Sequence, residues 1–191
     1  SMIFSFLFWG FGFLRMGTGG LTAQAYGAGD ADEVRSCLAR AAVIGLPAAF
    51  LLIVAQYPIA LAAFAVVEAS ADVEAFAREY FFVRIWAAPA TLLNFALLGW
   101  FIGVQNTRAA LYHQLCLNGV NIVLDLLFVL GFGWGVAGVA AATGLADVCA
   151  LIFGLFLARP ILQRIGGAFV RERIVQTDRL RRAIALNVDI F

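Results

Sequence analysis

Apolar residues along the chain gather into five long runs that are separated by short polar or glycine-rich segments. The hydrocarbon core of a bilayer is about 30 Å thick, so a helix needs roughly 20 residues to cross it. Each run meets that length. The pattern therefore predicts five membrane-spanning helices, at about 3–27, 41–66, 78–103, 109–131 and 135–158.

Composition supports a membrane environment for these runs. The chain has 191 residues, of which 63% are apolar and 13% charged; soluble domains average about 45–50% apolar and about 25% charged residues. A water-soluble fold of this length cannot bury so much apolar surface. We therefore predict an all-α integral membrane protein, a polytopic helix bundle. The formal net charge of +1 gives no indication of a nucleic-acid partner.

Arginine placement predicts the orientation of the bundle. One side of the predicted membrane carries ten arginines, whereas the other carries Arg78 alone; the ten are Arg35, Arg40, Arg108 and the seven arginines of segment 159–182. Basic loops remain on the cytoplasmic side, so we expect a multi-pass protein of the cytoplasmic membrane with its arginine-rich loops inside. Segment 159–182 is then a basic cytoplasmic connector that lies against anionic headgroups.

The sequence at both ends of the chain predicts that it is part of a longer protein. The predicted orientation puts the amino terminus outside, yet residues 1–3 contain no basic leader. A further apolar run begins at Ala183 and reaches Phe191 after nine residues. We expect at least one helix before residue 1 and more after Phe191, with 183–191 as the start of one of them.

Polar residues within the fourth run form one stripe. Asn118, Asn121 and Asp125 have the spacing i, i+3, i+7, which places them within an arc of about 60° on a helix. Inserting an Asp at the centre of a membrane helix costs about 2.5–3.5 kcal/mol, and protonating an ordinary carboxylate at pH 7 costs about 4 kcal/mol. Because the two costs are similar, a small change in hydration can move a proton on or off Asp125. Intramembrane carboxylates usually mark ion or proton pathways.

The fifth run is expected to carry a matching stripe. The segment Gly131 to Gly135 only reverses the chain, so the fourth and fifth runs should form an antiparallel hairpin. Counting from Trp134 pairs Asp125 with Thr143 in depth, nine residues to each side, and Asn121 with Asp147, 13 to each side. Thr143 and Asp147 share a face, so the two stripes can meet.

Two alternatives stay open at this point. Asn118 and its neighbours can serve as interhelical hydrogen-bonding groups that only pack helices. Arg84 lies close to the predicted depth of Asp125. It can pair with Asp125 or neutralise another buried group; it can also bind Glu79 or extend outward to headgroups.

Other patterns carry no recognisable chemistry. GWGVAG, residues 133–138, matches the dinucleotide motif GxGxxG but lacks the surrounding strand and helix unit, so its glycines indicate a tight turn. His113 has no second His or Cys at ligand spacing, and the three cysteines lie far apart. We predict no cofactor, no metal site beyond Na⁺ at Asp125, and no enzymatic activity, since no nucleophile with a partnered base is present.

Three blocks of the sequence resemble the multidrug and toxic compound extrusion (MATE) family, in its DNA-damage-inducible protein F branch. They are FGFLRMGTGGLTAQAYGAGD (11–30), YFFVRIWAAPATLLNFALLGWFIGVQNTR (80–108) and LNGVNIVLDLLFVLGFGWGVAGVAAATGLAD (117–147). The resemblance implies twelve helices in two lobes. Residues 1–158 would then be helices two to six of the amino-terminal lobe, 159–182 the connector between lobes, and 183–191 the start of the seventh helix.

The resemblance also implies a cation-coupling site. In that branch a carboxylate on the first helix joins an Asn and Asp on the fifth and a Thr on the sixth, which correspond here to Asn121, Asp125 and Thr143. Tyr80 is a further candidate contributor, and Asp147 and Arg84 are accessory candidates. The first helix and the carboxy-terminal lobe have no counterpart in this chain.

The resulting hypothesis is a cation-coupled antiporter, driven by H⁺ or Na⁺, that exports small organic and often cationic compounds. A flippase of the same architecture, acting on lipid-linked oligosaccharides, is the alternative transporter. A non-transporting membrane scaffold, in which the polar stripes only pack helices, is the alternative from another class.

Overall fold

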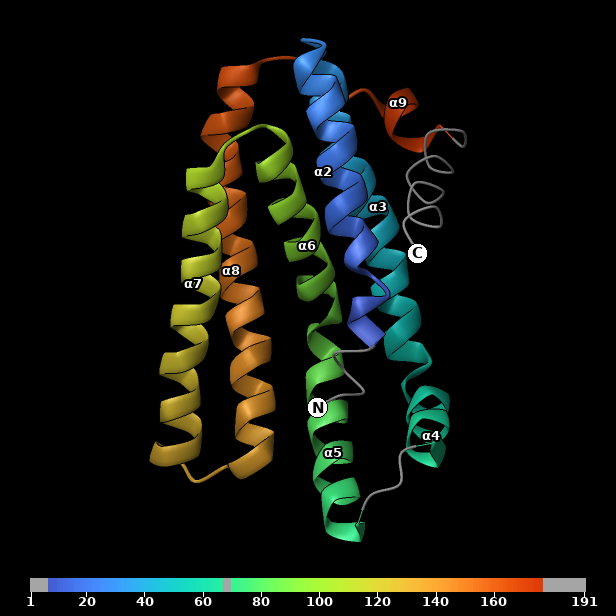
Figure 1. The fold of residues 1–191 in the computed structure, drawn as a ribbon, viewed down its shortest axis with the longest axis vertical. Helices are drawn as coiled ribbons and strands as arrows, with labels where there is room; N and C mark the ends of the chain where they lie inside the picture. The colour runs from blue at the N-terminus through green and yellow to red at the C-terminus, as the bar shows by residue number, and fades with distance from the viewer. Residues whose placement is uncertain (1–6, 67–69, 177–191) are drawn as a thin grey trace.

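Helices form all of the regular structure in residues 7–66 and 70–176, the part of the chain that the computed structural model describes. A central rod is made of α5, η1 and α6; α2 and α3 lie on one side of it and the α7–α8 hairpin on the other (Figure 1). The elements are α2 (Gly12–Gly27), α3 (Ala31–Val54), α4 (Gln56–Val66), α5 (Ala71–Arg84), η1 (Ile85–Ala87), α6 (Ala88–Gly103), α7 (Thr107–Asp125), η2 (Leu126–Gly131), α8 (Gly135–Ile165) and α9 (Arg171–Val175).

Four continuous helical segments in the described residues are long and apolar enough to cross a membrane: Ala31–Val54, Ala71–Gly103, Thr107–Gly131 and Gly135–Ile165. Large apolar side chains lie exposed on their outer faces, among them Leu130, 76% exposed, and Phe156, 71% exposed. Apolar surfaces of this kind are covered by lipid or by other protein. The prediction of an all-α membrane bundle is confirmed.

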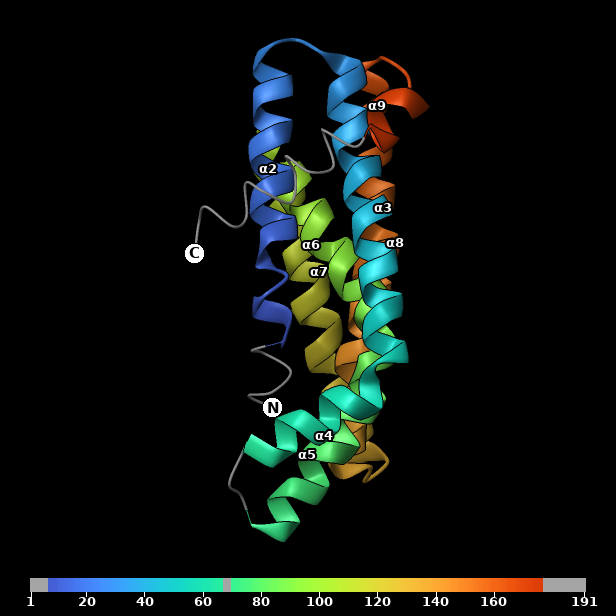
Figure 2. The ribbon, with the colours of Figure 1, turned by 90° about the vertical axis from the view of Figure 1, so that its right-hand side faces the viewer.

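The second predicted span differs from the observed helix in its limits. We expected a helix over 41–66, but α3 begins at Ala31, where Asp30 caps it by accepting a hydrogen bond from the Glu33 amide at 3.1 Å. The helix is interrupted at Ala55, and α4 continues from Gln56 at an angle to α3 (Figure 2). Pro58 explains the break, because its nitrogen has no hydrogen to donate to the Val54 carbonyl and its ring clashes with that carbonyl.

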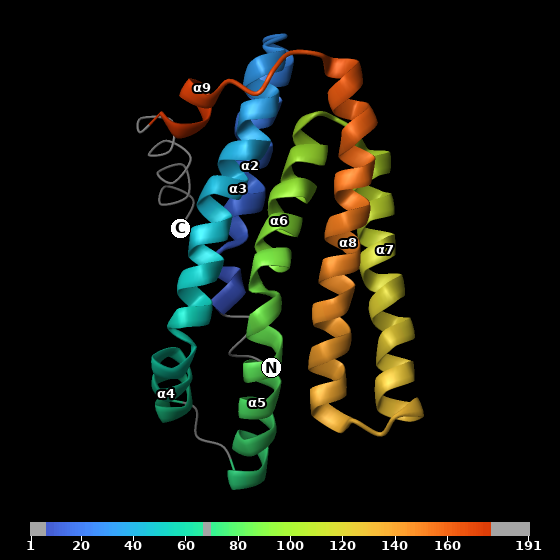
Figure 3. The same ribbon diagram turned by 180° about the vertical axis from the view of Figure 1, so that it is seen from behind.

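The connector predicted over 159–182 is partly helical. α8 extends to Ile165 and ends where Gly166 and Gly167 adopt positive φ angles of 78° and 72°. The chain then crosses to the start of α3 and forms the short helix α9 (Figure 3). The remainder of the predicted connector and the predicted helix start at 183–191 lie outside the described residues.

Small residues bring α2 and α6 into backbone contact. A Cβ atom added to Gly99 would overlap the Arg15 carbonyl, and one added to Gly103 would lie 2.6 Å from the Cβ of Thr22. Gly99 and Gly103 have the GxxxG spacing, which lets two membrane helices approach closely. This contact fixes the position of α2 against the central rod.

The α7–α8 hairpin closes through a π-helical segment and a glycine turn. Within η2 the Phe132 amide donates to the Leu127 carbonyl at 3.0 Å, the i→i+5 spacing of a π-helix. Gly133 and Gly135 then take φ angles of 68° and 56°, which a side chain disfavours. The rings of Phe128 and Trp134 pack across the turn with centroids 5.0 Å apart. The glycines of GWGVAG therefore form the turn and the start of α8, and a tight turn is what the sequence context predicted.

Candidate functional site

A buried ion pair joins the central rod to α8. Arg84, the last residue of α5, donates from Nη2 to Asp147 Oδ2 at 2.5 Å, and both residues are 4% exposed. Thr91 bridges the pair, since its Oγ1 lies 2.6 Å from Asp147 Oδ2 and 3.2 Å from Arg84 Nη1. Arg84 therefore neutralises Asp147. Among the alternatives for Arg84, the structure supports neutralisation of a group other than Asp125.

The same network extends to α7 through an amide. Asn94 Nδ2 donates to the Asp147 carbonyl at 2.9 Å, which turns Asn94 Oδ1 toward His113 Nε2, 3.1 Å away. An amide oxygen only accepts, so His113 is the donor and its Nε2 carries a proton. His113, 1% exposed, packs against Gly154 of α8. It is thus a buried structural partner of Asn94.

A second polar contact links α7 to α8 nearer the hairpin turn. Asn121 Nδ2 donates to Thr143 Oγ1 at 3.2 Å, and Thr143 Oγ1 donates in turn to the Val139 carbonyl at 2.8 Å. Both side chains are partly buried, whereas Asn118 on the same stripe is exposed. The two polar stripes do meet across the hairpin, through Asn121 and Thr143.

The register of this contact differs from the expected one. Depth counting paired Thr143 with Asp125 and Asp147 with Asn121; instead Thr143 bonds Asn121, and Asp147 bonds Arg84. The π-helical segment η2 explains the shift, because an i→i+5 turn uses more residues than an α turn. The α7 arm of the hairpin therefore needs extra residues to reach the depth of Thr143.

Asp125 lies at the junction between α7 and η2. Asp125 is partly buried as a whole, and its Oδ1 atom is fully buried with no hydrogen-bond partner among the described residues. A buried oxygen that lacks a donor is costly in a stable structure. This atom is the open acceptor of the Asn121, Asp125 and Thr143 group, which we name the hairpin site.

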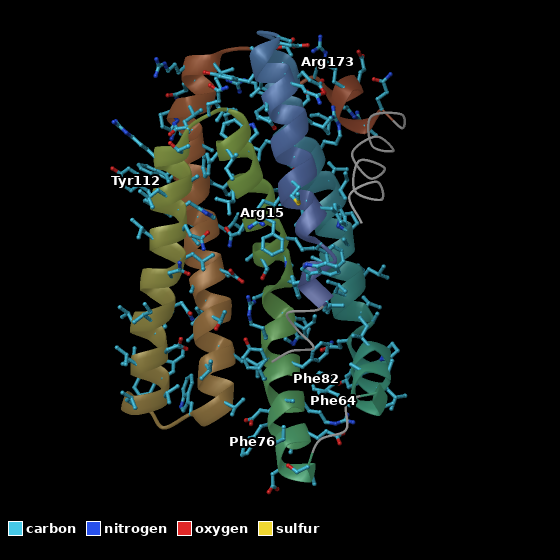
Figure 4. All side chains as sticks on the ribbon, in the orientation of Figure 1. Arg15, Phe64, Phe76, Phe82, Tyr112 and Arg173 are labelled. Atoms are coloured by element: carbon cyan, nitrogen blue, oxygen red, sulfur yellow. The ribbon has the colours of Figure 1, made fainter. Side chains whose placement is uncertain are left out.

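A cavity of about 480 Å³ lies beside the buried network. Arg84, Asn94, His113 and Asp147 line it together with Thr143 of the hairpin site, while Arg15 and the rings of Phe8, Trp9 and Phe95 form other parts of its wall. Arg15 lies at mid-height of the bundle (Figure 4). The cavity thus borders both the buried Arg84–Asp147 network and the hairpin site.

Tyr80 occupies a different environment from the hairpin site. It lies one turn before Arg84 in α5, is partly buried, and packs against the apolar core that includes Phe81 and Ile85. In the described residues, no group of three or more His, Cys, Asp and Glu side chains has the arrangement of a metal site.

Sequence reasoning missed the network partners Thr91, Asn94 and His113. A signal was present, because Thr91 lies seven residues after Arg84 and Asn94 ten, so all three fall on one side of a helix within an otherwise apolar run. In the sequence, His113 has no second His or Cys at ligand spacing. Its actual partner is an amide on another helix.

Comparison with known proteins identifies the family. The sequence profile of the MatE family matches residues 1–127. The chain belongs to the MatE family. The family resemblance noted in the sequence is therefore confirmed, and members of this family are membrane transporters, not enzymes.

Individual relatives agree with this assignment. The MatE chain is 39% identical over 187 residues to DNA damage-inducible protein F of Escherichia coli, covering 98% of the chain and 41% of that protein. It is 24% identical over 138 residues to the multidrug export protein MepA of Staphylococcus aureus, covering 72% of the chain and 31% of MepA. The chain thus spans about two fifths or less of these relatives.

Solved structures share the fold. A MOP superfamily transporter from Pyrococcus furiosus superimposes with a TM-score of 0.77 at 22% identity, over 97% of this chain and 42% of that one. A multidrug resistance MATE family transporter in an inward-facing conformation gives a TM-score of 0.76 at 24% identity, over 97% of this chain and 44% of that one. The helical arrangement described above is the MATE arrangement.

Proposed function

We propose that this chain forms most of the amino-terminal lobe of a cation-coupled antiporter that exports small organic compounds across the cytoplasmic membrane. Family membership supports transport, and the similarity to the multidrug export protein MepA supports the outward direction. The arginine-rich end of the bundle faces the cytoplasm in this proposal, in keeping with the distribution of basic loops.

The observation that carries the coupling role is the buried, unpartnered Oδ1 of Asp125 within the described residues. A proton or Na⁺ would satisfy that oxygen. Asn121, one helical turn before Asp125, and its partner Thr143 supply the next polar atoms along the hairpin, and their mutual hydrogen bond fixes the orientation of both. Asp147 is less suited to the task, because Arg84 already balances its charge.

Transport follows from coupling if cation binding favours one arrangement of the lobes over another. Loading Asp125 removes the cost of a buried open acceptor, so the loaded and empty states differ in free energy. Substrate would occupy the cavity beside the network, where Phe8, Trp9 and Phe95 offer apolar and aromatic contacts for organic, often cationic, compounds. Rocking of one lobe against the other then exposes the cavity to either side.

The test is efflux by the complete transporter reconstituted in proteoliposomes with an imposed pH or Na⁺ gradient. We expect Asp125→Asn to abolish gradient-driven efflux of a fluorescent organic cation, while Asn118→Ala, an exposed change on the same stripe, leaves it intact. The gradient that drives the wild-type protein identifies the ion. Unchanged efflux with Asp125→Asn would contradict the coupling role.

The same variants separate a transporter from a scaffold. A scaffold would show no gradient-driven efflux in the wild type, and Asp125→Asn would change only its stability. A lipid-linked oligosaccharide flippase would move a labelled lipid-linked sugar instead of the organic cation.

A further inference from the structure

A second cavity opens at the arginine-rich end of the bundle, away from the hairpin site. It has a volume of about 800 Å³ and lies between the α2–α3 turn, the α6–α7 turn and the last two turns of α8. Those three parts of the chain gather at one end of the bundle (Figure 1). We name this space the terminal cavity.

Two arginines from separate elements line the terminal cavity. Arg108 follows the α6–α7 turn and Arg164 lies in the last turn of α8, and both are exposed. Neither guanidinium makes an ion pair within the described residues, and the described lining contains no carboxylate. The cavity is therefore positively charged.

Three acidic residues at the α2–α3 turn and the start of α3 are already engaged. Asp30 accepts two hydrogen bonds from Arg173 Nη1, each 2.8 Å long. Glu33 forms an ion pair with Arg40 at 3.0 Å, and Asp32 accepts a hydrogen bond from the Ala168 amide at 2.7 Å. They are not available as counter-ions for Arg108 or Arg164. The missing negative charge must come from a ligand or from solvent ions.

The rest of the lining suits an amphiphile. Val34, Ile161 and Ile165 provide apolar wall, and Tyr26, Gln105 and Thr107 provide polar groups. The backbone at Gln105, in the α6–α7 turn, takes a φ of 58°, a left-handed conformation that is uncommon for residues other than glycine. Arginines above an apolar wall at a helix end match the junction between phosphate headgroups and acyl chains.

We propose that the terminal cavity binds the phosphate headgroup of an anionic phospholipid, with Arg108 and Arg164 as its charge partners. Guanidinium groups bind phosphate oxygens through paired N–H donors. The apolar wall holds the first part of the lipid chains. The lipid thereby joins the α6–α7 turn to the end of α8.

Lipid titration of the purified, delipidated complete transporter tests this site. Native mass spectrometry would follow binding of phosphatidylglycerol and, separately, of zwitterionic phosphatidylcholine. We expect each of Arg108→Gln and Arg164→Gln to weaken phosphatidylglycerol binding about fivefold and the double variant roughly 25-fold, from about 1 kcal/mol per basic residue. Wild-type protein should bind phosphatidylcholine far more weakly than phosphatidylglycerol.

The matched control is Arg159→Gln, an exposed arginine of α8 that does not line the terminal cavity. It should bind phosphatidylglycerol as the wild type does. Equal loss with Arg159→Gln, wild-type binding by the double variant, or equal binding of both lipids would overturn the proposal. Displacement of the lipid by millimolar inorganic phosphate would make a soluble phosphate the ligand and overturn the lipid assignment. Because the single variants change exposed side chains, an unchanged melting temperature verifies their fold.

Discussion

Arg84 and Asp147 form a buried ion pair at 2.5 Å between the end of α5 and the middle of α8. Removing either partner leaves the other charge buried without compensation, which typically costs several kcal/mol. The pair therefore ties the central rod to the α7–α8 hairpin, and it withdraws Asp147 from any role that needs an available carboxylate.

Neutralising Asp147 alone should destabilise the bundle. We expect Asp147→Asn to lower the free energy of unfolding by about 3–5 kcal/mol, because Arg84 keeps its charge in a buried position. The double change Arg84→Met and Asp147→Leu should recover most of that loss. Thr91 can still donate to the Ala87 carbonyl in the double variant. Denaturant unfolding in detergent micelles measures both, and a double variant as unstable as the single one would contradict this account.

A side chain at Gly99 should separate α2 from α6. We expect Gly99→Ala to cost about 1–3 kcal/mol, the usual range for an overpacked contact, since its Cβ meets the Arg15 backbone. Gly119→Ala in α7 is the control, because nothing lies within 4 Å of a Cβ at that position. Thermal unfolding should show a lowered midpoint for the first variant only. Equal midpoints would mean that α2 can move away at no cost.

The hydrogen bond between Asn121 and Thr143 should have a measurable coupling energy. A double-mutant cycle with Asn121→Ala and Thr143→Val should give about 0.6 kcal/mol, the average for such bonds inside membrane proteins. Repeating the cycle with Asn118→Ala in place of Asn121→Ala should give no coupling, as Asn118 is exposed. A coupling of zero for the Asn121 cycle would contradict the observed contact.

Loss of Arg173 should release α9 from the start of α3. Arg173 binds Asp30 through its side chain and Arg40 through its carbonyl, which Arg40 Nη2 reaches at 2.8 Å. We expect Arg173→Ala to speed amide hydrogen exchange across 168–175 severalfold, with a smaller effect at high salt, which screens partly exposed ion pairs. Arg171→Ala, an exposed change in the same helix, is the control. Equal exchange in both variants would argue against the ion pair as the restraint.

The sequence predicted the helical bundle because its signal is the length of the apolar runs, which the bilayer imposes. The sequence did not predict the break at Ala55 or the π-helical turn, since both depend on backbone hydrogen bonds that composition does not encode. Pro58 was visible, but whether it bends or interrupts a helix is decided by packing.

The polar contacts were predictable only in part. The stripe of Asn121 and Asp125 and its meeting with Thr143 followed from helical spacing and a short turn. The pairing of Arg84 with Asp147 did not, because those residues lie 63 positions apart and nothing in the sequence sets the rotation of α5 against α8. Asn94 and His113 were missed for the same reason.

The π-helical segment η2 changes the rotation of the side chains along the hairpin. The side chains up to Asp125 follow the regular rotation of an α-helix. The rings of Phe128, Phe132 and Trp134, which pack together and close the turn, lie within or after the π-helical segment and so follow a different rotation. Relaxation of η2 to an α-helix would therefore rotate Asp125 relative to Thr143 while the closure at the turn stayed in place. The π-helical turn thus sets the direction in which the Asp125 carboxylate faces within the hairpin.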